Sequence, residues 1–137
     1  MLRECLEGLQ IKPEGVYVDV TFGGGGHSLA ILEHLREGRL VAFDQDEDAK
    51  RQAELIQSRS FTFGQANFRY MKQYLKLNGV KQVDGILADL GISSHQIDSP
   101  ERGFSTRFEG PLDMRMDQKA KLTAAKILNE YSEEDLH

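Results

Sequence analysis

Four consecutive glycines, at positions 23 to 26, separate a short β-rich run at residues 16–20 from a segment with helix-like spacing of leucine and isoleucine that begins near Ser28. This order predicts a strand, a tight turn and a helix. Glycine has no Cβ, so such a turn can adopt a positive φ and let a ligand approach the backbone. The first turn of the helix adds unpaired N–H groups and a positive dipole end. We therefore expect a small ligand to bind at this turn.

An acidic residue follows the next apolar run. Residues 39–43 are predicted to form a second strand, and Asp44 comes directly after them. In a βαβ unit, a carboxylate about 20 residues beyond the glycines accepts hydrogen bonds from ribose hydroxyls. Residues 19–25 resemble the D-x-G-x-G-x-G turn of S-adenosylmethionine (SAM) enzymes more than a pyrophosphate loop, with Thr21 in place of the first glycine. The alternatives are a glycine corner that serves packing alone and a plain helix N-cap at Asp44.

Length and composition indicate an ordinary soluble domain. The 137 residues are 39% hydrophobic and 28% charged, which is enough to form a buried core. The single cysteine, Cys5, and the lack of a signal peptide or long apolar run favour a reducing cytoplasmic setting and no membrane span. The acidic run at 44–48 alternates as in a calcium loop, but Ala49 and Leu55 stand where that loop needs glycine and glutamate. No metal site is predicted.

Helices and strands are predicted to alternate along the chain. Amphipathic runs separate four β-rich segments, at residues 16–20, 39–43, 61–63 and 83–88. The helix after the glycines is expected to extend to Gly38, and the fourth strand is followed by a long irregular loop. Alternation of this kind predicts a parallel sheet whose ligand site lies beyond the carboxyl ends of the strands.

Several motifs then occur in a specific order. After the turn at 19–28 come Asp-Leu-Gly-Ile-Ser-Ser-His-Gln, Glu-Arg-Gly-Phe-Ser and Gly-Pro-Leu-Asp-Met-Arg-Met-Asp, at 89–96, 101–105 and 110–117. Together these segments resemble the bacterial 16S rRNA (cytosine N4)-methyltransferase family. The resemblance covers essentially the whole chain but only about the first half of a family member, so we expect this chain to be inactive by itself.

The resemblance implies a fold and a domain division. The fold is α/β, the class I SAM-dependent methyltransferase (Rossmann-like) parallel sheet, truncated to about its first four strands. Residues 1–104 would form the SAM-binding domain, and 105–137 the loop and first helix, at 122–131, of an inserted substrate-recognition domain. Because the fourth strand would leave a hydrophobic sheet edge, we also expect self-association through that edge.

The resemblance also implies the cofactor site. Matching motifs assign SAM binding to Gly25, Gly26, His27, Asp44, Phe68, Asp89 and Gln96. The glycines would admit the cofactor to the backbone, Asp44 would bind the ribose, and Phe68 would offer an apolar face to adenine. His27 and Gln96 can form hydrogen bonds nearby. As alternatives, Phe68 is a core aromatic and His27 a helix cap.

Asp89 is the candidate catalytic residue. The lone pair of a cytosine N4 amine is delocalised into the ring, so an acceptor that bonds the N4–H would localise it and direct its attack. The resemblance favours a second role for Asp89, that of holding the methionine end of SAM. In that case a backbone carbonyl, a water molecule or a residue beyond His137 removes the proton.

The predicted function is SAM-dependent methyl transfer to the exocyclic N4 amine of a cytosine in the decoding region of 16S rRNA. The partner would be that rRNA in the small ribosomal subunit or its precursor, in the cytoplasm, with no membrane. Residues 99–126 hold six basic and four acidic side chains, which is consistent with phosphate contacts or with an ordinary mixed-charge surface. The alternatives are methylation of another nucleic-acid amine, a non-catalytic SAM- or nucleotide-binding module, and an NAD-dependent dehydrogenase.

Overall fold

The structure, a computed structural model, describes residues 2–137 and divides the chain into two units, the first ending at Leu90 and the second beginning at Gly91. The first unit alternates helices and strands as the sequence predicts. Its elements are α1 (Leu2–Leu9), β1 (Val16–Asp19), α2 (Gly26–His34), β2 (Arg39–Asp44), α3 (Glu47–Ala53), β3 (Phe61–Gln65), η1 (Phe68–Tyr70), α4 (Met71–Leu77) and β4 (Gly85–Leu87).

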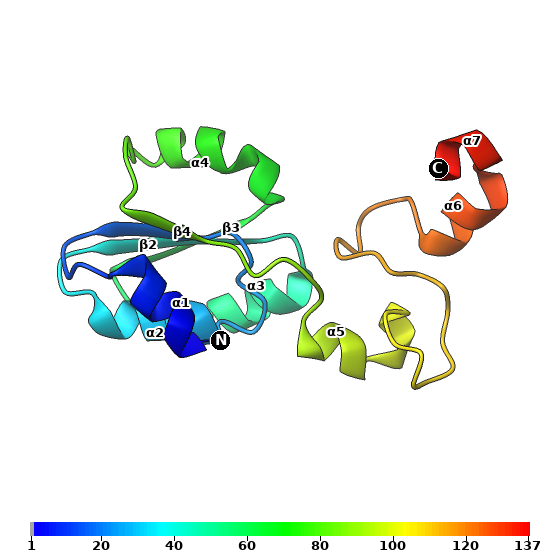
Figure 1. Cartoon of the computed structure of the whole chain (residues 1–137), viewed down its shortest axis with the longest axis horizontal. Helices are drawn as coiled ribbons and strands as arrows, with labels where there is room; N and C mark the ends of the chain where they lie inside the picture. The colour runs from blue at the N-terminus through cyan, green and yellow to red at the C-terminus, as the bar shows by residue number, and fades with distance from the viewer. Residues whose placement is uncertain (1) are drawn as a thin grey trace. The chain divides into compact units, whose positions relative to one another are not determined.

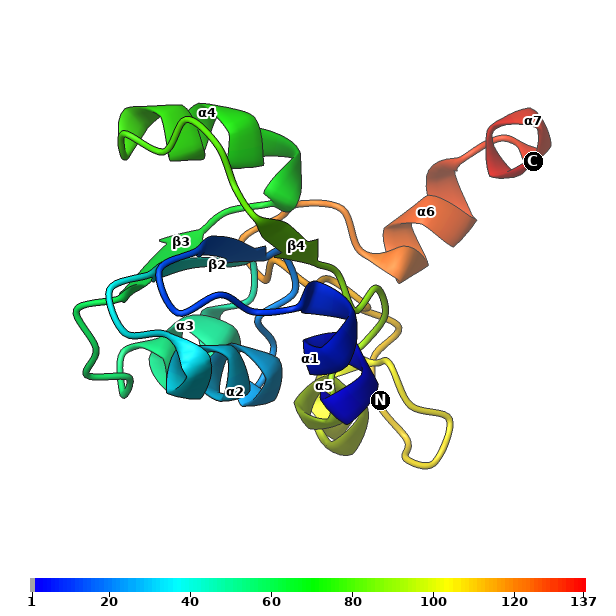
Figure 2. The same ribbon diagram turned by 60° about the vertical axis from the view of Figure 1, so that its left-hand side comes forward.

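The four strands form one parallel sheet in the order β3-β2-β1-β4. In the register of this sheet, Asp19 at the end of β1 lies opposite Ala42 of β2 and Leu87 of β4. Helix α4 covers one face of the sheet, and α1, α2 and α3 cover the other (Figures 1 and 2). This arrangement confirms the predicted α/β class with a parallel four-stranded sheet.

Side chains that alternate along the strands bury both faces of the sheet. Val18, Val41 and Phe43 belong to the core cluster that contains Leu75 of α4, whereas Tyr17 packs on the opposite face in the cluster that contains Ile31 of α2. A third cluster under α3 contains Phe22, Ala42, Ala49 and Ala53. Each large apolar side chain buried in this way contributes roughly 1.5–3 kcal/mol to the free energy of unfolding. The sheet is therefore a stable base, and it determines where the loops at its ends begin.

Several predicted boundaries differ from the structure, among them the start of α2, at Gly26, and the end of β3, at Gln65. The end of α2 and the bounds of β4 have identifiable causes. Helix α2 ends at His34 and not at Gly38, because the chain turns extended at Leu35 and the N–H groups of Arg36 and Gly38 donate to the Pro13 carbonyl. Strand β4 is shorter than predicted, Gly85–Leu87 instead of 83–88. It ends there because the backbone beyond Leu87 leaves β1, and the next donor, Asp89 N–H, bonds to a side chain.

The second unit contains α5 (Ser94–Asp98), η2 (Pro100–Arg102), α6 (Ala124–Glu130) and α7 (Glu133–Leu136). Helix α5 corrects the expectation of a wholly irregular loop after the fourth strand. It forms because Ser93 and Gln96 make a reciprocal capping box, a sequence signal that the prediction overlooked. Helix α6 lies within the predicted helix at 122–131. The domain limit between residues 104 and 105 stays a prediction. No helix in the described part of the chain is both long and apolar enough to cross a membrane.

Candidate cofactor site

The loops that follow β1, β2 and β4 are hydrogen-bonded to one another. Gly23 N–H donates to Asp44 Oδ2 over 2.8 Å, and so joins the glycine turn to the end of β2. Asp89 N–H donates to Thr21 Oγ1 over 2.7 Å, and so joins the end of β4 to the same turn. The structure therefore brings the glycine turn, Asp44 and Asp89 to the carboxyl edge of one sheet, the position where open α/β sheets bind ligands.

Two glycines of the turn have a positive φ, at which a residue with a side chain is strained: Gly23 at +52° and Gly25 at +82°. Gly25 has a φ of +82°, and a Cβ built on it would lie 2.7 Å from Phe22 Cζ. A Cβ on Gly24 or Gly26 would meet nothing within 4 Å. Gly25 is also the N-cap residue of α2, so the turn delivers the chain directly to the helix N-terminus. The turn thus combines two positions that favour glycine with open space beside Gly24 and Gly26.

Asp44 is fixed by the backbone and keeps spare acceptor capacity. Its Oδ2 accepts from Gly23 N–H, and its Oδ1 accepts from Asp46 N–H over 3.0 Å. Each carboxylate oxygen has two lone pairs, so each can accept one more hydrogen bond. Asp46, whose side chain accepts from Asp48 N–H, is the N-cap of α3. Asp44 is therefore not the helix cap that the sequence left as an alternative.

His27 and Phe68 present two further groups suited to a ligand. His27 lies in the first turn of α2, and its Nε2 is enclosed with no hydrogen-bond partner among residues 2–137. A buried polar atom without a partner costs about 1–3 kcal/mol, which a bound polar group would recover. Phe68 is 46% exposed, so it is not the core aromatic of the alternative interpretation. The spare lone pairs of Asp44, the exposed ring of Phe68 and the unpartnered nitrogen of His27 suit a ligand that carries hydroxyl groups and a flat ring.

Asp89 and Gln96 differ in their surroundings. The Asp89 side chain is exposed, and its backbone is held by Thr21. Gln96 lies in the second unit and is 5% exposed. Its Oε1 accepts from Ser93 N–H over 3.0 Å, which closes the capping box of α5. The structure thus gives Gln96 a local role, and its cofactor role remains a proposal.

Asp19 is a buried carboxyl beneath the turn to which the sequence assigned no separate role. It has no exposed surface, and its oxygens accept from Ser28 Oγ–H over 2.7 Å and from Thr21 N–H over 3.0 Å. Burial raises the pKa of Asp19 above its ordinary 3.8, while the hydrogen bonds from Ser28 and Thr21 oppose the shift. The aspartate in the first position of the D-x-G pattern was the sequence signal for a carboxyl that holds the turn. Its donors, Ser28 Oγ–H and the N–H and Oγ1–H of Thr21, are brought to it only by the fold.

Thr21 connects Asp19 to Asp89. Its Oγ1 accepts the Asp89 N–H and lies 3.4 Å from Asp19 Oδ1, to which it donates. We expect Thr21→Val to speed hydrogen exchange of the Asp89 amide by about tenfold, since one hydrogen bond contributes roughly 1–1.5 kcal/mol. Thr21→Ser keeps the hydroxyl and should retain the protection. The measurement is amide exchange by NMR, and equal exchange in Thr21→Val and the wild type would contradict this role.

The raised pKa of Asp19 also predicts a pH dependence. Above pH 3.8 the unfolded carboxyl ionises while the buried one still holds its proton, so its contribution to stability falls as pH rises through the folded-state pKa. The unfolding free energy of the wild type relative to Asp19→Asn should therefore be largest at low pH and decline across this window. Urea unfolding of both proteins at a series of pH values measures this difference in unfolding free energy. A difference that stays constant with pH would contradict the prediction.

A cavity of about 510 Å³ lies elsewhere in the first unit. It shares Phe22 and Gly24 with the glycine turn but contains none of the predicted site residues. Its other lining residues are Leu29, Leu32, Glu33, Gln52, Leu55, Ile56, Gln57 and Ser58, from α2, α3 and the segment after α3. Because it lacks Asp44 and Asp89, we assign the candidate cofactor site to the strand ends and not to this cavity.

Comparison with known proteins gives relatives with a shared name. The "Ribosomal RNA small subunit methyltransferase H" of Cytophaga hutchinsonii is 64% identical over 137 residues, which is 100% of this chain and 46% of that protein. The proteins of the same name from Flavobacterium psychrophilum and Bacteroides thetaiotaomicron are 63% and 56% identical, over 99% of this chain and 46% and 44% of their own lengths.

The chain thus spans about half the length of the curated relatives that it matches. A family model described as the MraW methylase family matches residues 1–137. That match covers the glycine turn, the three strand ends around it and the whole second unit. The chain belongs to the MraW methylase family.

Proposed function

We propose that this chain provides the SAM-binding site of an enzyme that methylates the exocyclic N4 amine of a cytosine in the decoding region of 16S rRNA. The observation that carries the proposal is the convergence of the glycine turn, Asp44 and Asp89, held by the Gly23–Asp44 and Thr21–Asp89 hydrogen bonds. The family match supports methyl transfer, and the names of the relatives support rRNA of the small subunit as the substrate.

Each site residue has a part in binding. SAM, when bound, supplies an electrophilic methyl group on a sulfonium. Asp44 would accept hydrogen bonds from the ribose with the lone pairs that the backbone leaves free. Gly25 and Gly26 would let the cofactor reach the turn, and Phe68 would cover adenine. The enclosed Nε2 of His27 would gain the partner that it lacks.

Asp89 would direct the attacking amine. Its exposed carboxylate can accept the N4–H of the cytosine, while Thr21 holds its backbone against the glycine turn. In its second role it holds the methionine end of the cofactor, with Gln96 as a further cofactor contact, and the proton leaves through another acceptor. In both roles the chain's main contribution is orientation, which supplies up to roughly 7–11 kcal/mol in a reaction between two bound partners.

The second unit would contact the substrate. We assign residues 105–137 to the start of the inserted substrate-recognition domain. The loop before α6 is ordered by Arg115, which forms a two-bonded pair with Asp113 and donates to the Ala120 carbonyl over 2.7 Å. This pairing lowers the pKa of Asp113 and keeps it ionised. The target cytosine must be unstacked to be reached, so the partner would be single-stranded or extruded rRNA in the cytoplasmic small subunit or its precursor.

The open edge of β4 supports self-association of this chain. Strand β4 ends the sheet order, and Ile86 at its centre is 48% exposed. An exposed apolar edge strand is a template for pairing with another strand. We expect Ile86→Lys to shift the sedimentation of the chain toward the monomer, with Lys72→Glu on α4 as a charge-changing control. Monomeric sedimentation of the wild type would contradict this.

A chimera tests the proposed function. This chain replaces the matching segment of the Cytophaga hutchinsonii relative, and the product is incubated with methyl-labelled SAM and small-subunit particles. Nucleoside mass spectrometry should find the label in N4-methylcytidine from 16S rRNA, with no transfer to duplex DNA. Transfer to DNA would favour another amine substrate. Undiminished transfer in an Asp89→Ala chimera would contradict the catalytic role of Asp89, and preference for NAD over SAM in a titration would contradict the cofactor.

A further inference from the structure

The segment around α4 is positively charged in an acidic protein. Residues 66–83 contain four basic side chains and no aspartate or glutamate, although the whole chain has a formal charge of −5. The basic residues, here named the α4 surface, are Arg69, Lys72, Lys76 and Lys81, and all four are exposed. The excess of positive charge is therefore local and on the surface of the first unit.

Helix α4 has one buried and one charged face. Met71, Tyr74 and Leu75 pack against the core cluster of the sheet. Lys72 and Lys76 are four residues apart and project from the opposite side, since residues at this spacing share a helix face. The inward face already accounts for the stability of the helix, so packing does not require the outer lysines.

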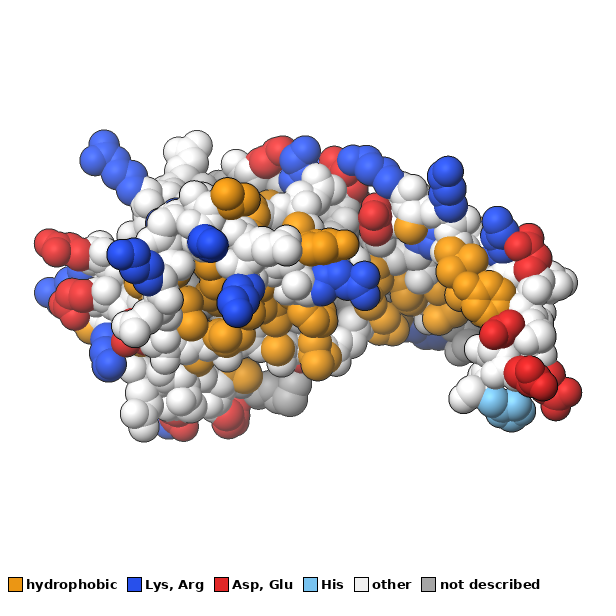
Figure 3. All heavy atoms as spheres, turned by 90° about the horizontal axis from the view of Figure 1, so that it is seen from above, with side chains coloured by type: hydrophobic (Ala, Val, Ile, Leu, Met, Phe, Trp, Pro, Cys, Tyr) orange, Lys and Arg blue, Asp and Glu red, His pale blue; other side chains and the backbone are white. Residues whose placement is uncertain are grey.

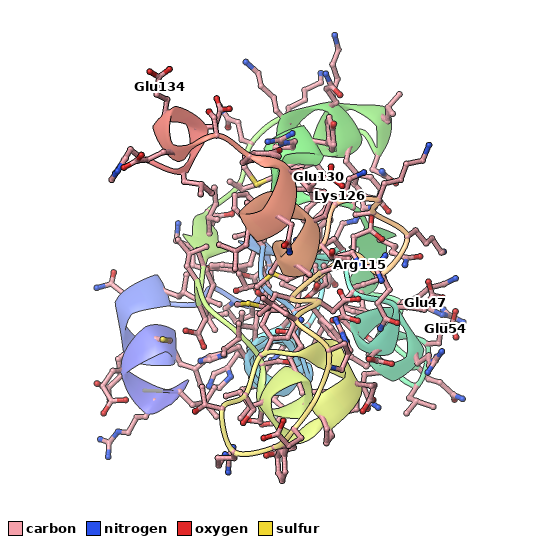
Figure 4. The ribbon with its side chains drawn as sticks, turned by 90° about the vertical axis from the view of Figure 1, so that its right-hand side faces the viewer. Glu47, Glu54, Arg115, Lys126, Glu130 and Glu134 are labelled. Carbon is pink, nitrogen blue, oxygen red and sulfur yellow. The ribbon has the colours of Figure 1, made fainter. Side chains whose placement is uncertain are left out.

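The charges of the α4 surface are not neutralised by neighbours. Within residues 2–137, none of the four side chains forms an ion pair. Helix α3 shows the opposite pattern, because Lys50 Nζ lies 3.8 Å from Glu47 and 3.9 Å from Glu54, the C-cap residue of the helix. Both glutamates are labelled in Figure 4. The α4 surface thus retains its positive charge for a partner outside the chain.

An exposed aromatic ring adjoins these charges. Tyr70 of η1 is 51% exposed and directly follows Arg69 in the sequence. Figure 3, which looks onto the side of the sheet that α4 covers, shows Lys and Arg side chains around exposed apolar ones. Positive charges that follow a phosphate backbone, combined with aromatic rings on which bases stack, are the usual means of binding single-stranded nucleic acid.

We propose that the α4 surface binds the phosphate backbone of the RNA substrate beside the target nucleotide. The inference rests on the proposed function and extends it to a contact surface. Segment η1 starts just after β3, and Ala66 N–H donates to the Asp44 carbonyl over 2.9 Å, so the charged segment begins at the edge that holds the candidate cofactor site. A membrane surface is the less suitable partner, because the apolar face of α4 points inward and an interfacial helix needs that face outward.

The test compares two double variants with the same change in charge. Lys72→Gln/Lys76→Gln removes two charges from the α4 surface, and Arg36→Gln/Arg59→Gln removes two exposed charges from loops outside it. Fluorescence anisotropy measures binding of a short labelled single-stranded RNA over a range of salt. Two lost phosphate contacts should weaken binding on the order of tenfold at about 0.1 M salt and flatten the salt slope by about 1.4. The control should match the wild type.

Equal RNA affinity in the lysine variant and the wild type would overturn the inference, and so would an equal loss in the arginine control. Binding to phosphatidylserine vesicles with no binding to RNA would overturn it in favour of a membrane. SAM titration of the same proteins separates the two proposals. If SAM fails to bind the wild type, the proposed function is contradicted, whereas the RNA comparison still decides the role of the α4 surface. All positions changed are exposed, so unchanged thermal unfolding confirms that the variants fold.

Discussion

Replacing Asp44 with alanine is expected to weaken SAM binding by about 100-fold. The carboxylate would bind the ribose through two hydrogen bonds to a charged acceptor, each contributing roughly 1.5–3 kcal/mol, and about 1.4 kcal/mol corresponds to a factor of ten. The change also removes the acceptor that positions Gly23 N–H, so the glycine turn loses its link to β2. Isothermal titration calorimetry of the chain with SAM measures the loss.

Asp48→Ala is the matched control for Asp44. It removes the same charge near the start of α3, where the Asp48 carboxylate pairs with Arg51 over 3.2 Å. Its SAM affinity should stay within about twofold of the wild type, as expected for a screened surface charge. Equal losses in the two variants would show that net charge, and not the ribose contact, governs binding.

Gly25→Ala is expected to destabilise the chain by about 2–3 kcal/mol and to remove SAM binding at the turn. A residue with a Cβ pays roughly 1–2 kcal/mol in the left-handed region. The new Cβ would also lie 2.7 Å from Phe22 Cζ, and Phe22 is buried against Phe61 and Phe63, so its ring has little room to move. Thermal unfolding measures the loss of stability. Isothermal titration calorimetry of the folded variant with SAM measures the loss of binding.

Gly24→Ala tests whether the effect is specific to position 25. A Cβ on Gly24 meets nothing within 4 Å, and Gly24 is exposed. We expect its melting temperature to match that of the wild type. If Gly25→Ala unfolds at the wild-type temperature as well, the turn tolerates a Cβ at a positive φ and the account of the glycine turn is wrong.

The order of strands and helices was predictable because it depends on local patterns. Apolar runs predicted the four strands, because the spacing of apolar residues along the chain is a local signal. The end of α2 was not predictable, since it depends on the Pro13 carbonyl accepting from Arg36 and Gly38. That contact exists only once the sheet has brought the two loops together.

The same distinction applies to the candidate site. The glycine turn and Asp44 follow from spacing within one βαβ unit, and the structure joins them by the hydrogen bond from Gly23 N–H to Asp44. The role of Thr21 does not follow from spacing, because its partner Asp89 is 68 residues away and meets it only through the β1–β4 pairing. From sequence, Thr21 looked like a departure from a glycine motif. In the fold, its hydroxyl is the link between the first and fourth strand ends.

The most direct test of the central claim is an NMR titration of the chain with SAM. We predict saturable binding in which the backbone amides that shift most lie at the carboxyl ends of the strands, at residues 21–27, 44–46, 66–68 and 87–89. Absence of saturable binding, or shifts confined to the cavity lined by α2 and α3, would contradict the claim that the strand ends form the cofactor site.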